Sequence, residues 1–294
     1  LAEKWDNVGL TVGNPYKPVK KILVALDVIP AVIEEAIHIG ADLIVTHHPM
    51  ILFQNIKNIQ TDTYLGKKIY DLIQNDISAY CAHTNLDIAF GGTNDTLAVL
   101  AGLEDVKILQ QTSSEELKKI VVYVPKGDEE IVRQAMCDAG AGFIGNYSQC
   151  AFYTEGTGTF LPLEGTTPFL GKQGILEKVQ EIRVETIVPE SLLYTVLDAM
   201  KKAHVYEEPA YDIYTVEQKG KCYGIGRIGT LKQNMTFEQY SIFLKKQLSL
   251  DTIRLVGDKN KNIKTVAHCT GSGVKFMEQA KNRGADVYLT GDIK

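Results

Sequence analysis

The sequence predicts an α/β protein in which two similar α/β halves form one domain, interrupted by an inserted ferredoxin-like (PII-like) α+β domain. Three observations predict this fold. Strands alternate with helices at both ends of the chain, the two ends share a seven-residue pattern, and the middle repeats its own strand–helix pattern. The expected boundaries are 1–112 with 225–294 for the discontinuous domain and 113–224 for the insert.

The first half of the chain alternates apolar runs of strand type with amphipathic helix patterns. The expected strands are 19–28, 41–46 and 78–82, and the expected helices are 30–39, 64–73 and 93–100. Because a helix between consecutive strands implies right-handed crossovers, this half predicts a mainly parallel sheet.

The last part of the chain shows the same alternation. The expected elements are helix 237–248, strands 252–256 and 265–269, helix 274–282 and strand 285–290. Residues 40–46 (GADLIVT) and 284–290 (GADVYLT) agree at four of seven positions. An internal duplication and a shared solution to helix–strand packing both explain this match. In either case both segments bring a loop to the carboxyl end of a strand, where open α/β sheets bind ligands.

The insert has its own internal repeat. Pro125 precedes Ala135 as Pro189 precedes Ala199, so the spacing from proline to alanine is ten residues in both copies. In each copy an apolar strand pattern ends at the proline and a helical pattern follows. A doubled strand–helix–strand unit of this length predicts a ferredoxin-like or PII-like fold.

Composition excludes several classes of protein. With 45% hydrophobic and 23% charged residues the chain is neither disordered nor fibrous. A net charge of −5 disfavours nucleic acid as a partner, since that affinity rests on clustered Lys and Arg. The five cysteines form no CxxC pair, which favours reduced thiols in a cytoplasmic protein.

The sequence predicts no contact with a membrane. No apolar run approaches the roughly 18 residues that cross a bilayer, and no signal peptide precedes the first strand. The first predicted strand has no helix before it and the last has no covering helix after it. Since such strands are normally buried on both faces, we expect the natural chain to extend past both ends.

Two adjacent histidines follow the second predicted strand at its carboxyl end. His47 and His48 come directly after residues 41–46, and Pro49 prevents the strand from continuing as a paired central element. Neighbouring side chains of a strand point to opposite faces, so two metal ions accept one imidazole each more readily than one ion accepts both. A histidine pair that only forms hydrogen bonds within a turn is the alternative.

A second polar cluster follows the third predicted strand. His83 and Asp87 lie four residues apart after residues 78–82, across an expected turn. Because parallel strands end at the same edge of a sheet, this cluster lies with His47 and His48. A set of imidazoles and a carboxylate suits Zn, Mn, Fe or Ni better than Ca. The sequence therefore predicts a divalent metal site at this edge.

Three further segments allow two interpretations each. Asp27 either accepts a hydrogen bond from the free N–H of a ligand histidine or caps the turn before Pro30. Residues 5–10 (WDNVGL) favour a packed N-terminal loop over a substrate contact. Residues 204–212 (HVYEEPAYD) favour a solvated hairpin or a subunit contact over the lining of a pocket.

Four motifs together resemble those of a known family. They are residues 5–10 (WDNVGL), 46–49 (THHP), 83–87 (HTNLD) and 291–294 (GDIK). Their order resembles that of the GTP cyclohydrolase 1 type 2 family (NGG-interacting-factor-like), and the resemblance covers the whole chain. Some members are similar in carrying an inserted PII-like or CutA-like domain with a loop like residues 206–212 (YEEPAYD).

The resemblance implies a dinuclear metal centre in a toroidal homohexamer. Its ligands map onto His47, His48 and Asp87, with two divalent metal ions per subunit, and His83 is the candidate catalytic proton carrier. The family's remaining His and Glu ligands are expected after residue 294. The implied activity is metal-dependent hydrolysis of GTP or a related small molecule. The alternative is a non-catalytic metal-binding or ligand-binding regulatory protein, because fold alone does not decide function.

Overall fold

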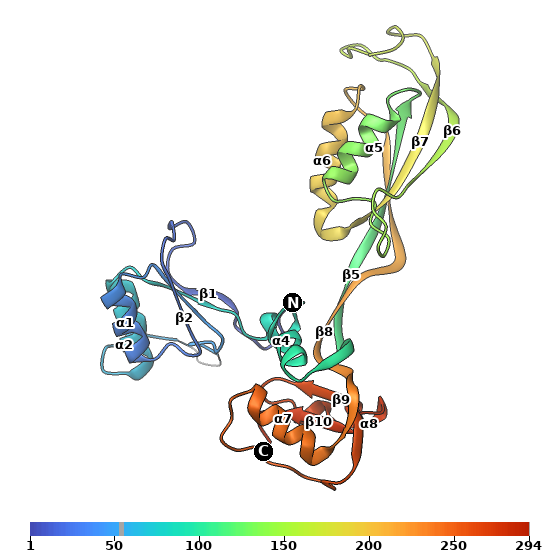
Figure 1. The fold of residues 1–294 in the computed structure, drawn as a ribbon. Helices are drawn as coiled ribbons and strands as arrows, with labels where there is room; N and C mark the ends of the chain where they lie inside the picture. The colour runs from blue at the N-terminus through green and yellow to red at the C-terminus, as the bar shows by residue number, and fades with distance from the viewer. Residues whose placement is uncertain (53–55, 294) are drawn as a thin grey trace. The chain divides into compact units, whose positions relative to one another are not determined.

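The computed structural model describes residues 1–52 and 56–293 (Figure 1). The chain divides into two compact units: the first contains Leu1–Ser113 with Tyr223–Lys294, and the second contains Ser114–Cys222. Lys294, the last residue of the GDIK motif, lies outside the described residues. Within the described part of the chain, no helix is long and apolar enough to span a bilayer.

The N-terminal part of the first unit contains a four-stranded sheet. Its strands are β1 (Gly9–Val12), β2 (Ile22–Ala25), β3 (Leu43–Thr46) and β4 (Ser78–Cys81), in the order β1-β4-β3-β2. β2, β3 and β4 are parallel, which confirms the predicted parallel arrangement, and β1 adds an antiparallel edge. β1 was not predicted, because four residues that begin with a glycine carry little periodicity.

Helices α1 (Pro30–Ile39) and α2 (Tyr64–Gln74) lie together beside this sheet (Figure 1). Both were predicted from helical spacing of apolar residues. Their apolar faces bury Ile33 and Leu72 against Ile44 of β3, and these three side chains are at most 2% exposed. β3 and β4 are parallel, with Thr46 paired to Cys81, so both strands end at the same edge. Short helices α3 (Thr84–Ile88) and α4 (Thr93–Leu100) follow β4.

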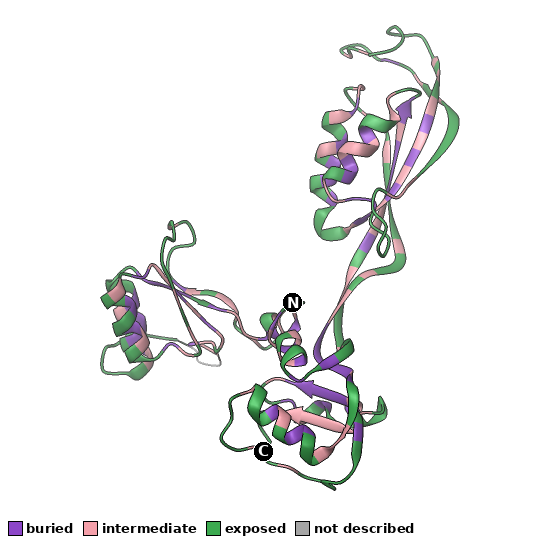
Figure 2. Ribbon diagram, in the orientation of Figure 1, coloured by how far each residue is buried: buried purple, intermediate pink, exposed green. Residues whose placement is uncertain are grey.

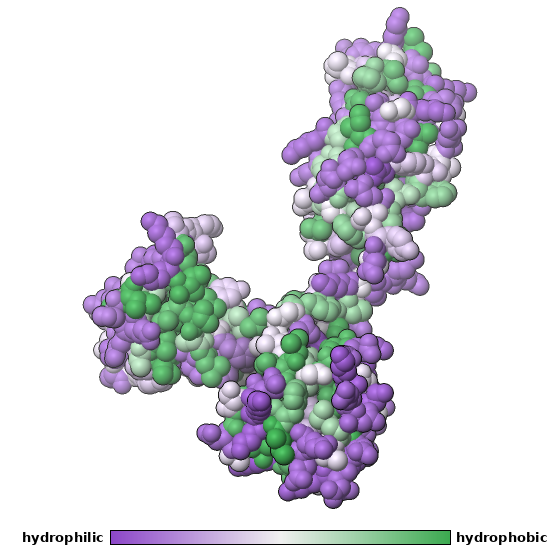
Figure 3. All heavy atoms as spheres, in the orientation of Figure 1, coloured by the Kyte–Doolittle hydropathy of each residue, from purple (hydrophilic) through white to green (hydrophobic). Residues whose placement is uncertain are grey.

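Apolar side chains remain exposed on the N-terminal sheet. Leu10, Tyr80, Val45 and Val24 form one row across all four strands. Val24 at the edge is 76% exposed, although it belongs to a strand. Figure 3 shows hydrophobic side chains gathered over this part of the chain. Contiguous apolar surface of this kind is typical of an interaction site.

A second sheet has six strands in the order β10-β9-β8-β5-β7-β6. They are β5 (Leu103–Pro125), β6 (Ala151–Phe160), β7 (Glu177–Pro189), β8 (Tyr211–Thr236), β9 (Asn262–Cys269) and β10 (Val287–Thr290). β9 and β10, which the predicted helix 274–282 separates in the sequence, are a parallel pair, whereas the printed registers of β5, β6, β7 and β8 are antiparallel. Long antiparallel strands β5 and β8 run through both units, which sequence periodicity did not indicate.

The C-terminal part of the first unit carries α7 (Phe237–Gln247), η2 (Val274–Phe276) and α8 (Met277–Asn282). The predicted strand 252–256 is wrong, because the chain there is irregular. Ile253 packs on the core but Val256 is 92% exposed, so this stretch has too little apolar burial to hold it in a sheet.

The two matching heptapeptides make the same hydrogen bonds. Asp42 accepts the backbone N–H groups of Lys20 and Lys21 at 2.8 and 2.9 Å. Asp286 accepts those of Lys264 and Thr265, both at 3.0 Å. Each aspartate therefore ties its own strand to the neighbouring one, just before β2 in one half and within β9 in the other.

The second unit follows the order β5-α5-β6-β7-η1-α6-β8, with α5 (Glu129–Asp138), η1 (Glu190–Leu192) and α6 (Leu193–Ala203). α5 and α6 lie side by side against the sheet (Figure 1). β7 alternates, as Figure 2 shows: Ile182 and Val184 are buried in the helix-covered core, whereas Glu181 and Arg183 point to the opposite face. That opposite face carries polar side chains and borders a pocket.

Candidate metal centre

Three imidazole rings meet at the carboxyl edge of the N-terminal sheet. His47 and His48 follow β3, and His83 follows β4 immediately before α3. The ring centroids of His47 lie 5.3 Å from His48 and 5.1 Å from His83, and those of His48 and His83 are 6.0 Å apart. The structure thus brings together the two clusters that the sequence placed at one edge.

All three rings use the same nitrogen for a hydrogen bond to oxygen. Nδ1 of His47 donates to the Ala82 carbonyl at 2.8 Å. Nδ1 of His48 pairs with Asp27 and Nδ1 of His83 pairs with Asp6, both at 2.9 Å. A carbonyl or carboxylate oxygen can only accept, so Nδ1 carries the proton and the Nε2 lone pair stays available. Metal-ligating histidines have this arrangement.

Asp87 completes the group from α3. Its side chain is almost fully buried, and its Oδ1 lies 3.8 Å from Nε2 of His47. The same oxygen accepts hydrogen bonds from the hydroxyls of Thr93 and Thr270, the latter at 3.2 Å. The expected turn between His83 and Asp87 is the short helix α3.

Asn94 and Thr270 add further hydrogen bonds around Asp87. Asn94 donates to the Asp87 carbonyl and accepts from the Thr270 backbone N–H, at 3.0 and 3.1 Å. Sequence reasoning missed these positions together with Thr93. A threonine just after a strand and an asparagine inside a helix are common residues without a pattern of their own, so no signal in the sequence marked them.

Asp6 holds His83 in place. Its side chain has no exposed surface and accepts from Nδ1 of His83 and from the backbone N–H groups of Asn7 and Thr84. Burial raises the pKa of the Asp6 carboxyl, but the hydrogen bonds from Thr84 and His83 outweigh burial and hold the pKa below its ordinary value. The WDNVGL segment therefore orients a site residue through Asp6, whereas the predicted packed loop is wrong, because Trp5 and Leu10 are exposed and Gly9 and Leu10 begin β1.

Of the two interpretations of Asp27, the structure agrees with a hydrogen bond to a histidine and not with a cap before α1. The residue at the N-cap of α1 is Ile29, and no side chain caps that helix. The carboxylate of Asp27 instead pairs with His48, so it fixes the orientation of a ring at the metal edge. Trp5 lies edge-on to His83 with ring centroids 5.9 Å apart.

The donor set has the chemistry of a site for Zn, Mn, Fe or Ni, with imidazole Nε2 atoms beside a carboxylate. It is not a closed cage. Within residues 1–52 and 56–293, no three His, Cys, Asp or Glu side chains converge closely enough to hold a metal ion. His47 and Asp87 bring donor atoms within 3.8 Å of each other, and further donors are needed for a complete coordination shell.

The segment 204–212 lies outside this edge and lines a pocket in the second unit. Tyr206, Glu207 and Glu208 are among the residues around that pocket, so the interpretation favoured from sequence, a solvated hairpin or subunit contact, is incomplete. The sequence of an acidic, aromatic loop does not show whether the loop lines a cavity.

Comparison with known proteins identifies related chains. The sequence matches the family described as Duf34/NIF3 (NGG1p interacting factor 3) over residues 1–294. A Bacillus subtilis protein named GTP cyclohydrolase 1 type 2 homolog is 49% identical, over 99% of this chain and 78% of the relative. A protein of the same name from Listeria innocua is 44% identical, over 100% of this chain and 79% of the relative.

Solved structures agree with these matches. The crystal structure of a Bacillus cereus protein related to NIF3 has a TM-score of 0.92 and 48% identity, covering 100% of this chain and 78% of the other. The crystal structure of Staphylococcus aureus protein SA1388 has a TM-score of 0.73 and 32% identity, covering 100% of this chain and 77% of the other.

Proposed function

This chain belongs to the Duf34/NIF3 (NGG1p interacting factor 3) family, and from that premise we propose that it is a dinuclear metal-dependent hydrolase of a nucleotide or related small molecule. The observation that supports the proposal most directly is the shared hydrogen-bond pattern of His47, His48 and His83. Each ring gives Nδ1–H to an oxygen and keeps Nε2 for another partner.

His47, His48 and Asp87 are the proposed ligands. Two divalent cations at this edge would supply Lewis acidity and an activated water. Asp27 and the Ala82 carbonyl set the orientation of the two imidazoles, and the hydroxyls of Thr93 and Thr270 set that of the carboxylate.

His83 is the proposed proton carrier. Its ring lies about as close to His47 as His48 does, and the buried Asp6 carboxylate fixes its tautomer. An imidazole gains and loses protons near neutral pH, which suits general acid–base catalysis. Because Asp6 keeps the proton on Nδ1, Nε2 is the atom that exchanges a proton with the substrate.

GTP is the first substrate to test, because curated relatives are named GTP cyclohydrolase 1 type 2 homolog. The sequence has no P-loop, so triphosphate recognition would depend on other groups. Hydrolytic opening of a guanine imidazole ring is the reaction type that this name suggests for the proposed site.

The test is metal content followed by GTP turnover for the natural protein, His48→Ala and Asp87→Ala. We expect about two metal ions per subunit in the natural protein and fewer in both variants, with turnover lost in each. His38→Ala is the control, because His38 is exposed on α1. Full metal retention in both site variants overturns the ligand assignment. Two bound ions with no turnover of GTP or other hydrolysable substrates overturns the enzyme assignment.

We also propose that the protein is a cytoplasmic homohexamer with residues 113–224 as an inserted ferredoxin-like (PII-like) domain. The uncovered apolar row from Leu10 to Val24 supports an oligomer, since its burial against another subunit is favourable. The strand order β8-β5-β7-β6 with two helices in a β-α-β-β-α-β sequence supports the ferredoxin-like assignment.

The alternative function is a non-catalytic regulatory protein that binds metal or another ligand. The open ligand set at the histidine edge and the separate pocket of the second unit favour it. Metal retention without turnover distinguishes this function from hydrolysis, because a regulatory site binds its ions without consuming a substrate.

A further inference from the structure

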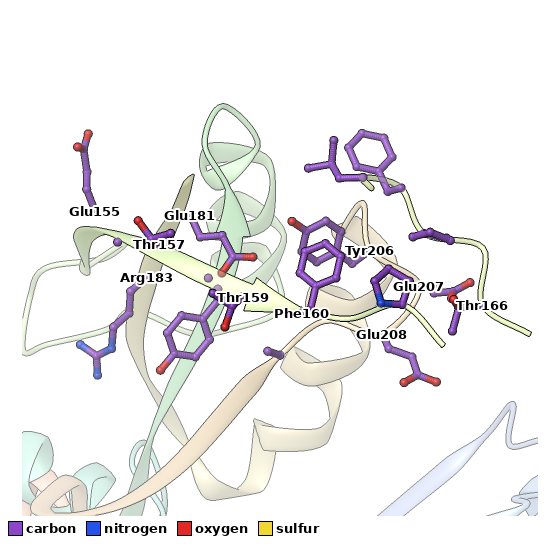
Figure 4. A pocket seen from close by; sticks show the side chains of 18 of the residues that line it. Glu155, Thr157, Thr159, Phe160, Thr166, Glu181, Arg183, Tyr206, Glu207 and Glu208 are labelled. Atoms are coloured by element: carbon purple, nitrogen blue, oxygen red, sulfur yellow. The ribbon is translucent and has the colours of Figure 1, made fainter. Parts of the chain in front are cut away.

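The second unit contains a pocket of about 560 Å³, shown in Figure 4. Its floor is the face of the sheet that α5 and α6 leave uncovered, and its walls come from the end of β6, the loop after it and the segment around Tyr206. This volume is within the usual range for small-molecule sites, about 300–1,000 Å³. The pocket lies entirely within one compact unit.

Strand register places a carboxylate on the floor. Glu181 of β7 pairs with Gly156 of β6 and with Pro125 of β5, so its side chain leaves the sheet on the pocket side. Gly158 makes room for it, because a Cβ at that position would lie 1.9 Å from Oε2 of Glu181. Figure 4 shows Glu181 extending toward Phe160 and Tyr206.

Aromatic rings form the adjacent wall. The ring centroid of Tyr206 lies 5.9 Å from that of Phe160 and 6.4 Å from that of Phe169. Buried His204 holds this wall, because its Nδ1 accepts from the Tyr206 backbone N–H and its Nε2 donates to the Tyr123 carbonyl, both at 3.0 Å. Both ring nitrogens of His204 are thus used in the neutral state.

Glu181 forms no ion pair with a cation among residues 1–52 and 56–293. Arg183, the nearest cation on the same strand face, pairs with Glu185, and Glu155 at the pocket rim pairs with Lys126. Burial raises the pKa of the Glu181 carboxyl, and the neighbouring Tyr206 hydroxyl only partly offsets this effect.

The polar groups around the pocket favour a positive ligand. Glu155, Glu181, Glu207 and Glu208 line it together with the single arginine Arg183. The Tyr206 hydroxyl is buried beside the Glu181 carboxyl, so both groups are present at the same part of the pocket. A carboxylate beside several aromatic faces is the combination that recognises an organic cation, because both attract its charge as water is removed.

We propose that this pocket binds a small organic cation whose charged head, an amidinium or ammonium group, pairs with Glu181 between the rings of Phe160, Phe169 and Tyr206. The site is independent of the proposed hydrolase centre. Its occupancy needs no metal, so it can be measured in the presence of a chelator. Failure of one proposal therefore leaves the other intact.

The test is calorimetric titration of the full chain, in chelator, with benzamidine and with its neutral analogue benzamide. We expect saturable binding of benzamidine and at least about tenfold weaker binding of benzamide, because a charge-assisted hydrogen bond contributes that much. Glu181→Gln keeps the shape of the side chain and removes its charge, so it should weaken benzamidine about tenfold or more. Glu116→Gln is the control, since Glu116 pairs with Lys219 away from the pocket.

A second pair of variants distinguishes a loss of binding from a loss of folding. Phe169 lines the pocket and Phe152 does not, yet both are largely exposed, at 59% and 64%. Phe169→Ala should weaken benzamidine several-fold, whereas Phe152→Ala should not. Absence of benzamidine binding, equal binding of benzamide, or unchanged affinity in both Glu181→Gln and Phe169→Ala overturns the proposal.

Discussion

Nε2 of His47 lies 3.8 Å from Oδ1 of Asp87, although β3 and α3 present these residues 40 positions apart. Neither residue is held by its own element alone. His47 is oriented by the carbonyl of Ala82, and Asp87 by the hydroxyls of Thr93 and Thr270. The geometry of the candidate centre therefore depends on residues that would not ligate a metal themselves.

The first prediction concerns Thr270. Thr270→Val keeps the shape of the side chain but removes the hydroxyl that orients Asp87, so we expect metal affinity to fall about tenfold or more. Titration of the metal-free protein with Zn²⁺ measures the change. Thr265→Val, on the strand that Thr270 follows, is the control, because the hydrogen bonds to the Asp87 carboxylate come from Thr93 and Thr270 and not from Thr265. Equal affinity in the two variants would contradict the orienting role.

The second prediction concerns Asp6. Asp6→Asn replaces one acceptor oxygen with an amide that opposes the N–H and hydroxyl donors around it, so we expect a loss of about 1–3 kcal/mol in the free energy of unfolding. Urea denaturation measures it. The exposed Asp62, changed to Asn, should stay within about 0.5 kcal/mol of the natural protein. A neutral effect at Asp6 would show that these hydrogen bonds contribute little.

The third prediction is a pH dependence of stability from His268. This ring is fully buried, and neither nitrogen has a hydrogen-bond partner within the described residues. Burial, with a smaller contribution from Arg227, lowers its pKa from 6.5 to about 4. The unfolded chain thus binds a proton between these values while the folded chain does not, so stability is fully present above the unfolded pKa and is lost as the pH falls.

When the pH is lowered from 7.5 to 5, this group should reduce the free energy of unfolding by about 2 kcal/mol. His268→Leu should remove that part of the pH dependence, whereas the exposed His38, changed to Ala, should leave it in place. Urea denaturation at both pH values gives the difference. The same slope in His268→Leu and in the natural protein would rule out this origin.

The fourth prediction concerns Gly66 in α2. Replacing a helical glycine with alanine usually stabilises a helix by about 1 kcal/mol. Here a Cβ would lie 2.2 Å from the backbone oxygen of Gln60 and 2.7 Å from its nitrogen, so Gly66→Ala should destabilise the fold instead. Thermal unfolding measures the sign. Lys67→Ala, at the exposed next position, is the control for helix propensity. A higher melting temperature for Gly66→Ala would contradict the close contact.

Local sequence pattern was sufficient to predict most helices and the carboxyl edge of the N-terminal sheet. The predicted helices 30–39 and 93–100 agree with α1 and α4 in both bounds, since their apolar spacing and terminal residues are local features. The stretch 252–256 failed because a β-branched run becomes a strand only where a neighbour pairs with it.

The sequence by itself determined the family, the histidine pair at the end of β3 and the second cluster after β4, because each is a short motif next to a recognisable strand. Only the tertiary structure decided how these residues are held. Asp6, Thr93 and Thr270 reach the site from separate segments, and no local pattern encodes a contact across 78 or 183 positions. The pocket around Glu181 likewise exists only in the folded protein, where three paired strands form an uncovered sheet face and two loops pack beside it.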